Sequence, residues 1–217
     1  MRVIGILGGI GPESTAEFYR RLINRIQKRG YVKGNLDYPH ILINSIPAPE
    51  LFLENPDLSM YQEGVRELER WGAEFIVIVC NTANLYLLKL KEEIGISIID
   101  LVEVVDTYLT NHSVSSITVV GSSRTVQQNL FTFKNRASVP LSLEDSRLLD
   151  EVILQYNSGM KVGQLDRVLE IVSRYNVAGN LILVGCTELS TIVASANLPI
   201  IDTMDILVDA TIEKWRS

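Results

Sequence analysis

Short runs of apolar, often β-branched residues alternate along the chain with longer stretches in which apolar residues recur at helical spacing. Several of the short runs are apolar at consecutive positions, which is typical of strands covered by helices on both faces. This alternation predicts an α/β protein with mainly parallel sheets. Strands are expected at residues 3–7, 41–46, 75–79, 96–99, 117–120, 181–184 and 199–201, with a weaker one at 139–143. Helices are expected at residues 13–28, 60–71, 84–93, 102–109, 126–136, 147–156, 165–175, 189–195 and 206–215.

The predicted organisation is doubled. Each half contains, in the same order, a strand that ends in a glycine turn, a strand that ends in a cysteine turn, and a strand that ends in Ile-Ile-Asp. In the first half these segments are Gly8-Gly9, Cys80-Asn81-Thr82 and Ile98-Ile99-Asp100; in the second they are Gly121-Ser122-Ser123, Gly185-Cys186-Thr187 and Ile200-Ile201-Asp202. We therefore expect one α/β domain at residues 1–103 and 205–217, with the C-terminal helix packing back on it, and a second at residues 104–204.

Composition and charge narrow the function classes. With 217 residues and 47% apolar residues, the chain is expected to fold around a real core. The formal charge of −6, from 20 basic and 26 acidic residues, argues against a nucleic-acid surface. Because the sequence contains no run of about 18 apolar residues and no secretory leader pattern, we expect no membrane partner and a cytoplasmic location.

Only two cysteines, Cys80 and Cys186, occur in the chain. They are too few and too far apart for a disulfide framework or a zinc site. Both follow predicted strands, where the ligands of open parallel sheets bind. Each precedes a predicted helix start, a setting expected to lower a thiol pKa towards neutrality. Two such thiols on opposite sides of a cleft could remove a proton from a carbon atom and return one to the opposite face, which inverts that centre.

Three segments together resemble the aspartate/glutamate racemase family: Gly8-Gly9-Ile10-Gly11-Pro12-Glu13-Ser14-Thr15, Cys80-Asn81-Thr82-Ala83 and Gly185-Cys186-Thr187-Glu188-Leu189. The resemblance implies a PLP-independent amino-acid racemase that uses no cofactor and no metal. It also implies two pseudo-symmetric three-layer α/β domains with the active site in the cleft between them, and a homodimer. Glu188 after the second Cys-Thr is similar to the aspartate branch, so aspartate is the favoured substrate, ahead of glutamate.

The resemblance also assigns roles to individual residues. Cys80 and Cys186 would be the general acid and base. The turn that contains Gly9 would let the backbone approach the ligand closely. The substrate's carboxylate or amino group would be held by Asn81, Thr82, Thr125 and Thr187, with Arg124 and Ser45 as weaker candidates.

Some residues that a dicarboxylic substrate would need are missing. Members of the family with a Pro-Asp-Arg-Thr segment have an arginine where this chain has residues 46–50, which include none. The lysine that some members carry would fall near Asn157 or Ser158, and Arg124 is the one basic residue near a predicted site turn. Two alternatives therefore stay open: a related isomerase or racemase for another small acid, of maleate or hydantoin type, and a non-catalytic protein that binds a small acid.

Overall fold

The computed structural model describes residues 1–49, 51, 55–196 and 198–217. It contains two four-stranded parallel sheets, whose strand orders are β2-β1-β3-β4 and β6-β5-β7-β8. The strands are β1 (Ile4–Gly8), β2 (Ile41–Ser45), β3 (Phe75–Ile78), β4 (Ser97–Ile98), β5 (Ser116–Val120), β6 (Ala137–Ser138), β7 (Leu181–Val184) and β8 (Ile200–Asp202). The order is the same in both sheets, so the predicted doubling and the predicted α/β class with parallel sheets are confirmed.

The helices are α1 (Pro12–Lys28), α2 (Ser59–Arg70), α3 (Leu87–Lys91), α4 (Leu101–Asn111), α5 (Ser123–Gln127), α6 (Leu143–Asn157), α7 (Gln164–Tyr175), α8 (Thr187–Ile192) and α9 (Thr203–Arg216). Helices α1, α4 and α9 lie against one face of the first sheet and α2 and α3 against the other. Alternate residues of β3 point to opposite faces: Ile76 packs in a cluster with residues of α2 and α3, whereas Val77 packs in another with residues of α1, α4 and α9. This alternation follows from the two-residue period of a strand.

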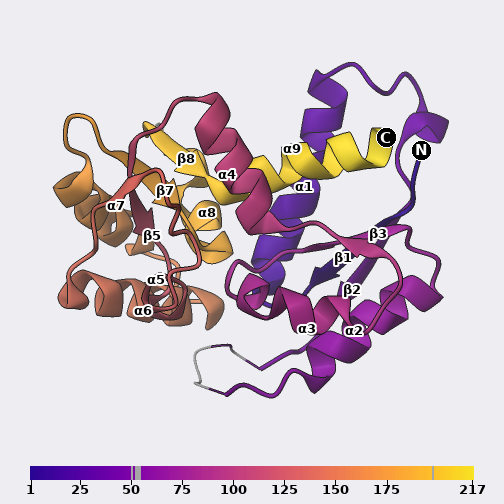
Figure 1. Cartoon of the computed structure of the whole chain (residues 1–217), viewed down its shortest axis with the longest axis horizontal. Helices are drawn as coiled ribbons and strands as arrows, with labels where there is room; N and C mark the ends of the chain where they lie inside the picture. Colours follow the sequence, from indigo (N-terminus) through magenta and orange to yellow (C-terminus); the bar gives the residue numbers. More distant parts are fainter. Residues whose placement is uncertain (50, 52–54, 197) are drawn as a thin grey trace.

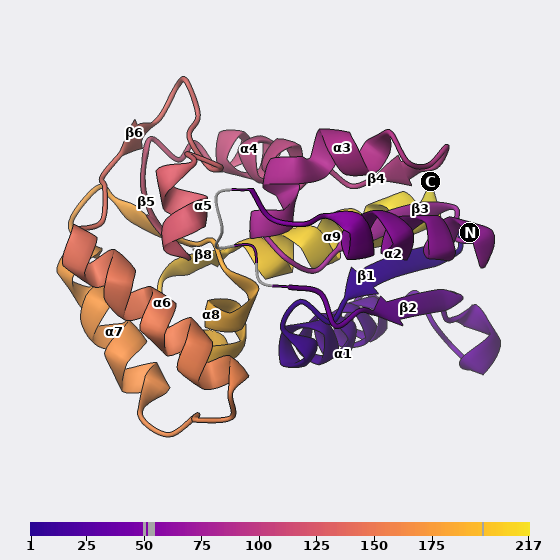
Figure 2. The same cartoon turned by 90° about the horizontal axis from the view of Figure 1, so that it is seen from below.

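The second sheet is covered on one face by α6, α7 and α8, as Figures 1 and 2 show. Val120, Ile182 and Val184 of this sheet pack there. On its other face, Ile117 and Leu183 belong to the same apolar cluster as α4 and α9. The two units therefore share part of their core.

The C-terminal helix α9 leaves the second unit and runs along α1 in the first, so that the two chain ends lie close together (Figure 1). Trp215, near its end, is buried in the shared cluster, and its carbonyl accepts a hydrogen bond from the backbone N–H of Arg2 at 3.1 Å. This packing agrees with the expected return of the last helix. The expected division at residues 103 and 104 falls inside α4. The domain bounds stay a prediction.

Two expected elements are wrong. The helix expected at residues 126–136 is the short α5, because Asn129 adopts a left-handed conformation (φ 54°) after it, and Leu130 and Phe131 turn into the core. The strand expected at 139–143 is the two-residue β6, which lies just before that range. Pro140 has no N–H to donate to a ladder, and the Ser142 side chain caps α6 by accepting the backbone N–H of Asp145.

Smaller differences concern helix starts. The helix expected at residues 84–93 is a 3₁₀ turn at Thr82–Tyr86 followed by α3. α9 begins at Thr203 rather than residue 206, because the Asp202 carboxylate accepts the backbone N–H of Met204 as its cap. Among the described residues, no helix is both long enough and apolar enough to span a membrane.

Candidate active site

The two cysteines follow equivalent strands of the two sheets. Cys80 comes after β3 and Cys186 after β7, and these strands hold the same place in their sheets. Both side chains line one cavity of ≈ 210 Å³, to which the first unit contributes Cys80 and the second Cys186. The cysteines are 8% and 6% exposed, respectively. The doubling of the fold thus brings two buried thiols to one small cavity.

The glycine turn after β1 forms one wall of this cavity. Gly9 lines it with a positive φ of 84°, and a Cβ there would lie 2.3 Å from the carbonyl oxygen of Ile46. Gly11 has φ 82°, and a Cβ there would lie 2.2 Å from Oε1 of Glu188. The turn therefore needs glycine because the neighbouring strand end and a side chain from the second unit both approach it closely.

Glu188 is a further residue of the site. It follows Cys186-Thr187 in the first turn of α8, and from the sequence it indicated only a branch of the family. It is buried and lines the cavity. Its Oε2 accepts hydrogen bonds from Cys186 Sγ at 3.0 Å and from Thr187 Oγ1 at 3.1 Å. Its place two residues after a candidate catalytic cysteine could have indicated this contact.

The environment raises the pKa of both thiols, contrary to what the helix starts led us to expect. Burial and the Glu188 carboxylate raise the pKa of Cys80 to about 12, although backbone N–H groups of Ala83 and Thr82 oppose the shift. The same two causes raise the pKa of Cys186 well above its usual value. In the free protein at neutral pH, both cysteines are therefore thiols.

Hydroxyl groups from both units meet at the cavity. Thr82 Oγ1 lies 3.0 Å from Thr125 Oγ1 and 3.3 Å from Ser122 Oγ, and Ser122 also caps α5. Thr82 and Ser122 line the cavity, whereas Thr125 is buried beside them. Ser122 lies in the motif Gly-Ser-Ser, and its equivalence to the first glycine turn could have indicated it.

The other predicted binding residues do not line this cavity. Asn81 is buried and donates a hydrogen bond to Thr203 Oγ1 at 2.8 Å, and Thr187 donates to Glu188. Arg124 donates to the hydroxyl of Tyr86 at 3.4 Å. Ser45 ends β2 and is exposed. Their roles in substrate binding stay predictions.

Almost the whole chain matches one protein family. Residues 7–211 match the model of the family described as Asp/Glu/Hydantoin racemase. The chain belongs to this family. A curated racemase-family relative, the broad specificity amino-acid racemase RacX of Bacillus subtilis (strain 168), is 26% identical over 227 residues, covering 98% of each protein.

Solved racemase structures share the fold. The aspartate racemase of Picrophilus torridus has a TM-score of 0.82 at 20% identity, covering 100% of this chain and 95% of that one. An aspartate racemase homologue from Pyrococcus horikoshii OT3 has a TM-score of 0.78 at 22% identity, and each chain is fully covered. The glutamate racemase of Thermus thermophilus has a TM-score of 0.64 at 15% identity, covering 99% of this chain and 80% of that one.

In this racemase-family chain, an ion pair joins the two units close in sequence to residues that line the cavity. Asn157, at the end of α6, lines the cavity where some relatives were expected to carry a lysine. Lys161 follows it, pairs with Glu13 at the start of α1, and lies with its ammonium 5.4 Å from the ring centre of Tyr156. The Glu13 pKa is lowered by the hydrogen bond from Lys161.

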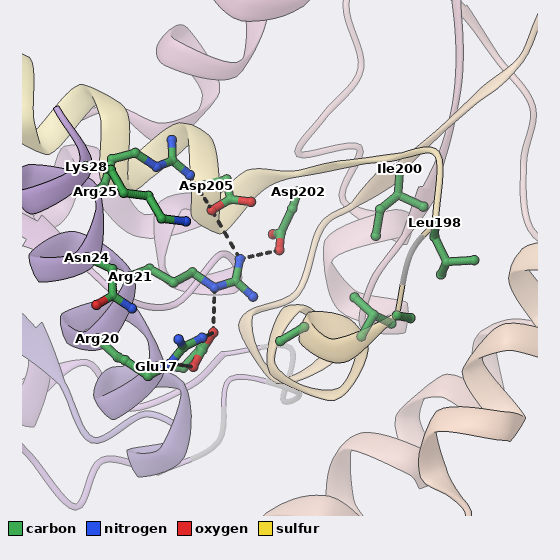
Figure 3. Close-up of a pocket in the computed structure, with 13 residues that line it drawn as sticks. Glu17, Arg20, Arg21, Asn24, Arg25, Lys28, Leu198, Ile200, Asp202 and Asp205 are labelled. Atoms are coloured by element: carbon green, nitrogen blue, oxygen red, sulfur yellow. Dashed lines mark hydrogen bonds and ion pairs between the residues drawn. The ribbon is translucent and has the colours of Figure 1, made fainter.

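A second cavity, of ≈ 330 Å³, lies between α1 and the segment that leads into α9 (Figure 3). It is larger than the thiol cavity, but neither cysteine lines it. Arg21 of α1 points across it and donates to Asp202 Oδ2 at 2.6 Å and to the Ser190 carbonyl at 2.8 Å. Ser190 Oγ lies 2.5 Å from Asp202 Oδ1 and 3.1 Å from the carbonyl oxygen of Cys186. This network ties α1 of the first unit to the helix that begins beside Cys186.

Proposed function

We propose that the protein is an amino-acid racemase in which Cys80 and Cys186 act as general acid and base on opposite faces of the substrate's α-carbon. The observation that carries the proposal is that one thiol from each unit lines the same small cavity. Family membership supports the reaction class. The proposal needs no cofactor, because two opposed groups can exchange a proton with the α-carbon directly.

Each turnover requires one thiolate and one thiol. One thiolate takes the α-proton and becomes a thiol, while the C–H electron pair stays on the substrate as a carbanion conjugated with its carboxylate. The opposite thiol then donates its proton to the other face and becomes a thiolate. The product has inverted configuration, and the two cysteines have exchanged protonation states.

Glu188 is suited to prepare Cys186 for this reaction. Its Oε2 accepts the S–H of Cys186, which orients this thiol, and its charge raises the pKa of the thiol in the free protein. An ammonium group of a bound amino acid would oppose that effect and favour the thiolate, because a nearby positive charge lowers a thiol pKa. The hydroxyls of Thr82 and Ser122 are suited to hold the substrate's α-carboxylate.

The substrate is tested with a panel. The family resemblance favours aspartate and then glutamate, whereas the broad specificity of the Bacillus subtilis relative favours a wider set of amino acids. Chiral chromatography and exchange of the α-proton in D₂O should detect turnover with at least one L-amino acid. Maleate and a hydantoin, included in the same panel, test the related-isomerase alternative, and ligand-dependent thermal stabilisation without turnover would indicate a binding protein.

The two-base assignment has its own variants. Cys80→Ser and Cys186→Ser should each abolish net racemisation, because a serine hydroxyl is too weak an acid to replace either thiol. If either variant racemises at the wild-type rate, the two-base proposal is wrong. The homodimer and the cytoplasmic location also stay proposals; sedimentation equilibrium tests the first and cell fractionation the second.

A further inference from the structure

Apolar side chains make up much of the wall around the two thiols. They are Ile10, Pro12, Ala48, Leu51 and Ile153, and they come from both units. The wall also carries polar groups: the hydroxyls of Thr82 and Ser122, the Asn157 amide and the Glu188 carboxylate. A ligand between the thiols would thus meet both polar groups and hydrocarbon.

The charge on this wall is negative. Among the described residues that line the cavity, none is Arg, Lys or His, and Glu188 is the carboxylate. The five residues outside the description are Glu50, Phe52, Leu53, Glu54 and Asn197, so they add no positive charge either.

Two cations that could have met a substrate carboxylate, Arg124 and Lys161, have other partners. Arg124 donates to the hydroxyl of Tyr86, and Lys161 pairs with Glu13. Neither residue lines the cavity. The arginine that would form a two-pronged contact with a second substrate carboxylate is therefore missing from the wall.

Charge balance then separates the possible substrates. A neutral amino acid is a zwitterion, whose ammonium group can face Glu188 while its carboxylate faces the hydroxyls. Aspartate or glutamate brings one more carboxylate, which would be buried without a cation and repelled by Glu188. Size does not discriminate, because aspartate, asparagine and leucine contain the same number of non-hydrogen atoms. The cavity of ≈ 210 Å³ is small, which suits a small amino acid.

We infer that the racemase acts on amino acids with uncharged side chains in preference to acidic ones. The side chain lies against Ile10, Leu51 and Ile153, and the ammonium group faces Glu188. This inference rests on the racemase activity proposed above and specifies the substrate class for the same site.

The decisive experiment compares L-aspartate, L-asparagine and L-leucine with the wild-type protein, by α-proton exchange in D₂O and by chiral chromatography. Asparagine is the matched control, since it has the shape of aspartate without the charge. We expect kcat/KM for asparagine and leucine to exceed that for aspartate by about 100-fold or more. Equal or better turnover of aspartate would overturn the inference but leave the racemase proposal intact, whereas absence of exchange with every amino acid would defeat the racemase proposal itself.

A charge introduced into the wall provides a second test. Asn157→Lys places an ammonium group at the cavity, and Ser158→Lys places the same group on the next residue. Both residues are exposed, but only Asn157 lines the cavity. We expect Asn157→Lys to raise the ratio of kcat/KM for aspartate to that for asparagine by about tenfold, and Ser158→Lys to change it by less than about twofold. An equal change in both variants, or no change in either, would contradict the assigned role of wall charge.

Discussion

Removal of the Arg21 guanidinium should destabilise the protein strongly, because Asp202 would keep its charge in a buried position. The two side chains are only 11% and 9% exposed. Breaking a buried ion pair from one side costs about 3–5 kcal/mol. Asp202 would retain its contacts with Ser190 Oγ and the backbone N–H of Met204, so we expect Arg21→Met to cost about 3 kcal/mol, at the lower end of that range.

Thermal and urea unfolding measure this loss directly. For a chain of this length, about 3 kcal/mol corresponds to a fall in Tm of about 6–12 °C. The control is Arg20→Met on the same helix, whose side chain is 59% exposed and pairs with Glu17. That variant should lose about 0.5 kcal/mol or less, because exposed ion pairs contribute little. If Arg21→Met costs no more than Arg20→Met, the network does not hold the two units as described.

The pH dependence of the same variant checks the cause. Burial raises the pKa of Asp202 above its usual value, and Arg21 opposes this shift. Without Arg21 the folded-state pKa should rise further. A carboxyl group whose pKa is higher in the folded than in the unfolded state binds its proton more tightly when folded, so stability falls as pH rises through the two pKa values. The deficit of Arg21→Met should therefore be largest at neutral pH and shrink towards pH 4, and Asp202→Asn on that background should recover part of it.

Three further outcomes concern the cavity. Because its pKa is about 12, Cys80 should react slowly with iodoacetamide at pH 7. The alkylation rate, followed by mass spectrometry, should rise about tenfold per pH unit up to pH 10. A rate that does not change with pH would contradict the raised pKa. Glu188→Gln removes the negative charge that raises both thiol pKa values, so alkylation of Cys80 and Cys186 at a given pH should become faster, and a slower reaction would refute this account. Gly11→Ala should cost more than about 1 kcal/mol on urea unfolding, because it combines a positive φ with a clash against Glu188. The control Gly30→Ala has a positive φ of 68° but open space around it, so it should cost clearly less. Equal losses in the two variants would show that the contact with Glu188 is unimportant.

The fold could be predicted from the sequence where a local pattern determined the structure. Strand β7 (Leu181–Val184) has the expected bounds because it is an uninterrupted apolar run closed by glycine. The prediction of a helix at residues 126–136 was wrong. Leu130 and Phe131 have the spacing of apolar residues on a helix, but they lie in a turn that packs in the core with residues distant in the sequence. Tertiary burial, and not helical periodicity, determines the conformation there.

The candidate site was predicted in part, for the same reason. Cys80 and Cys186 could be found because each follows a strand, and Asn157 because it stands where a cation was expected. The contact of Glu188 with Gly11 depends on how the two units meet, as do the raised pKa values of the thiols. A helix start beside a cysteine suggested a lowered pKa, but burial and a neighbouring carboxylate outweigh the backbone N–H groups here.

The doubled topology explains why the site depends on contacts between the units. Each sheet contributes one sulfur, at the end of the strand next to β1 or β5, and neither sheet alone encloses the cavity. The distance between the sulfurs is therefore set by elements that cross from one unit to the other: the shared apolar cluster, Arg21 with Asp202, and Lys161 with Glu13. In the proposed reaction one thiolate removes the α-proton and the opposite thiol donates another, so both sulfurs must reach the α-carbon. A small rotation between the units should therefore lower kcat before it exposes the core.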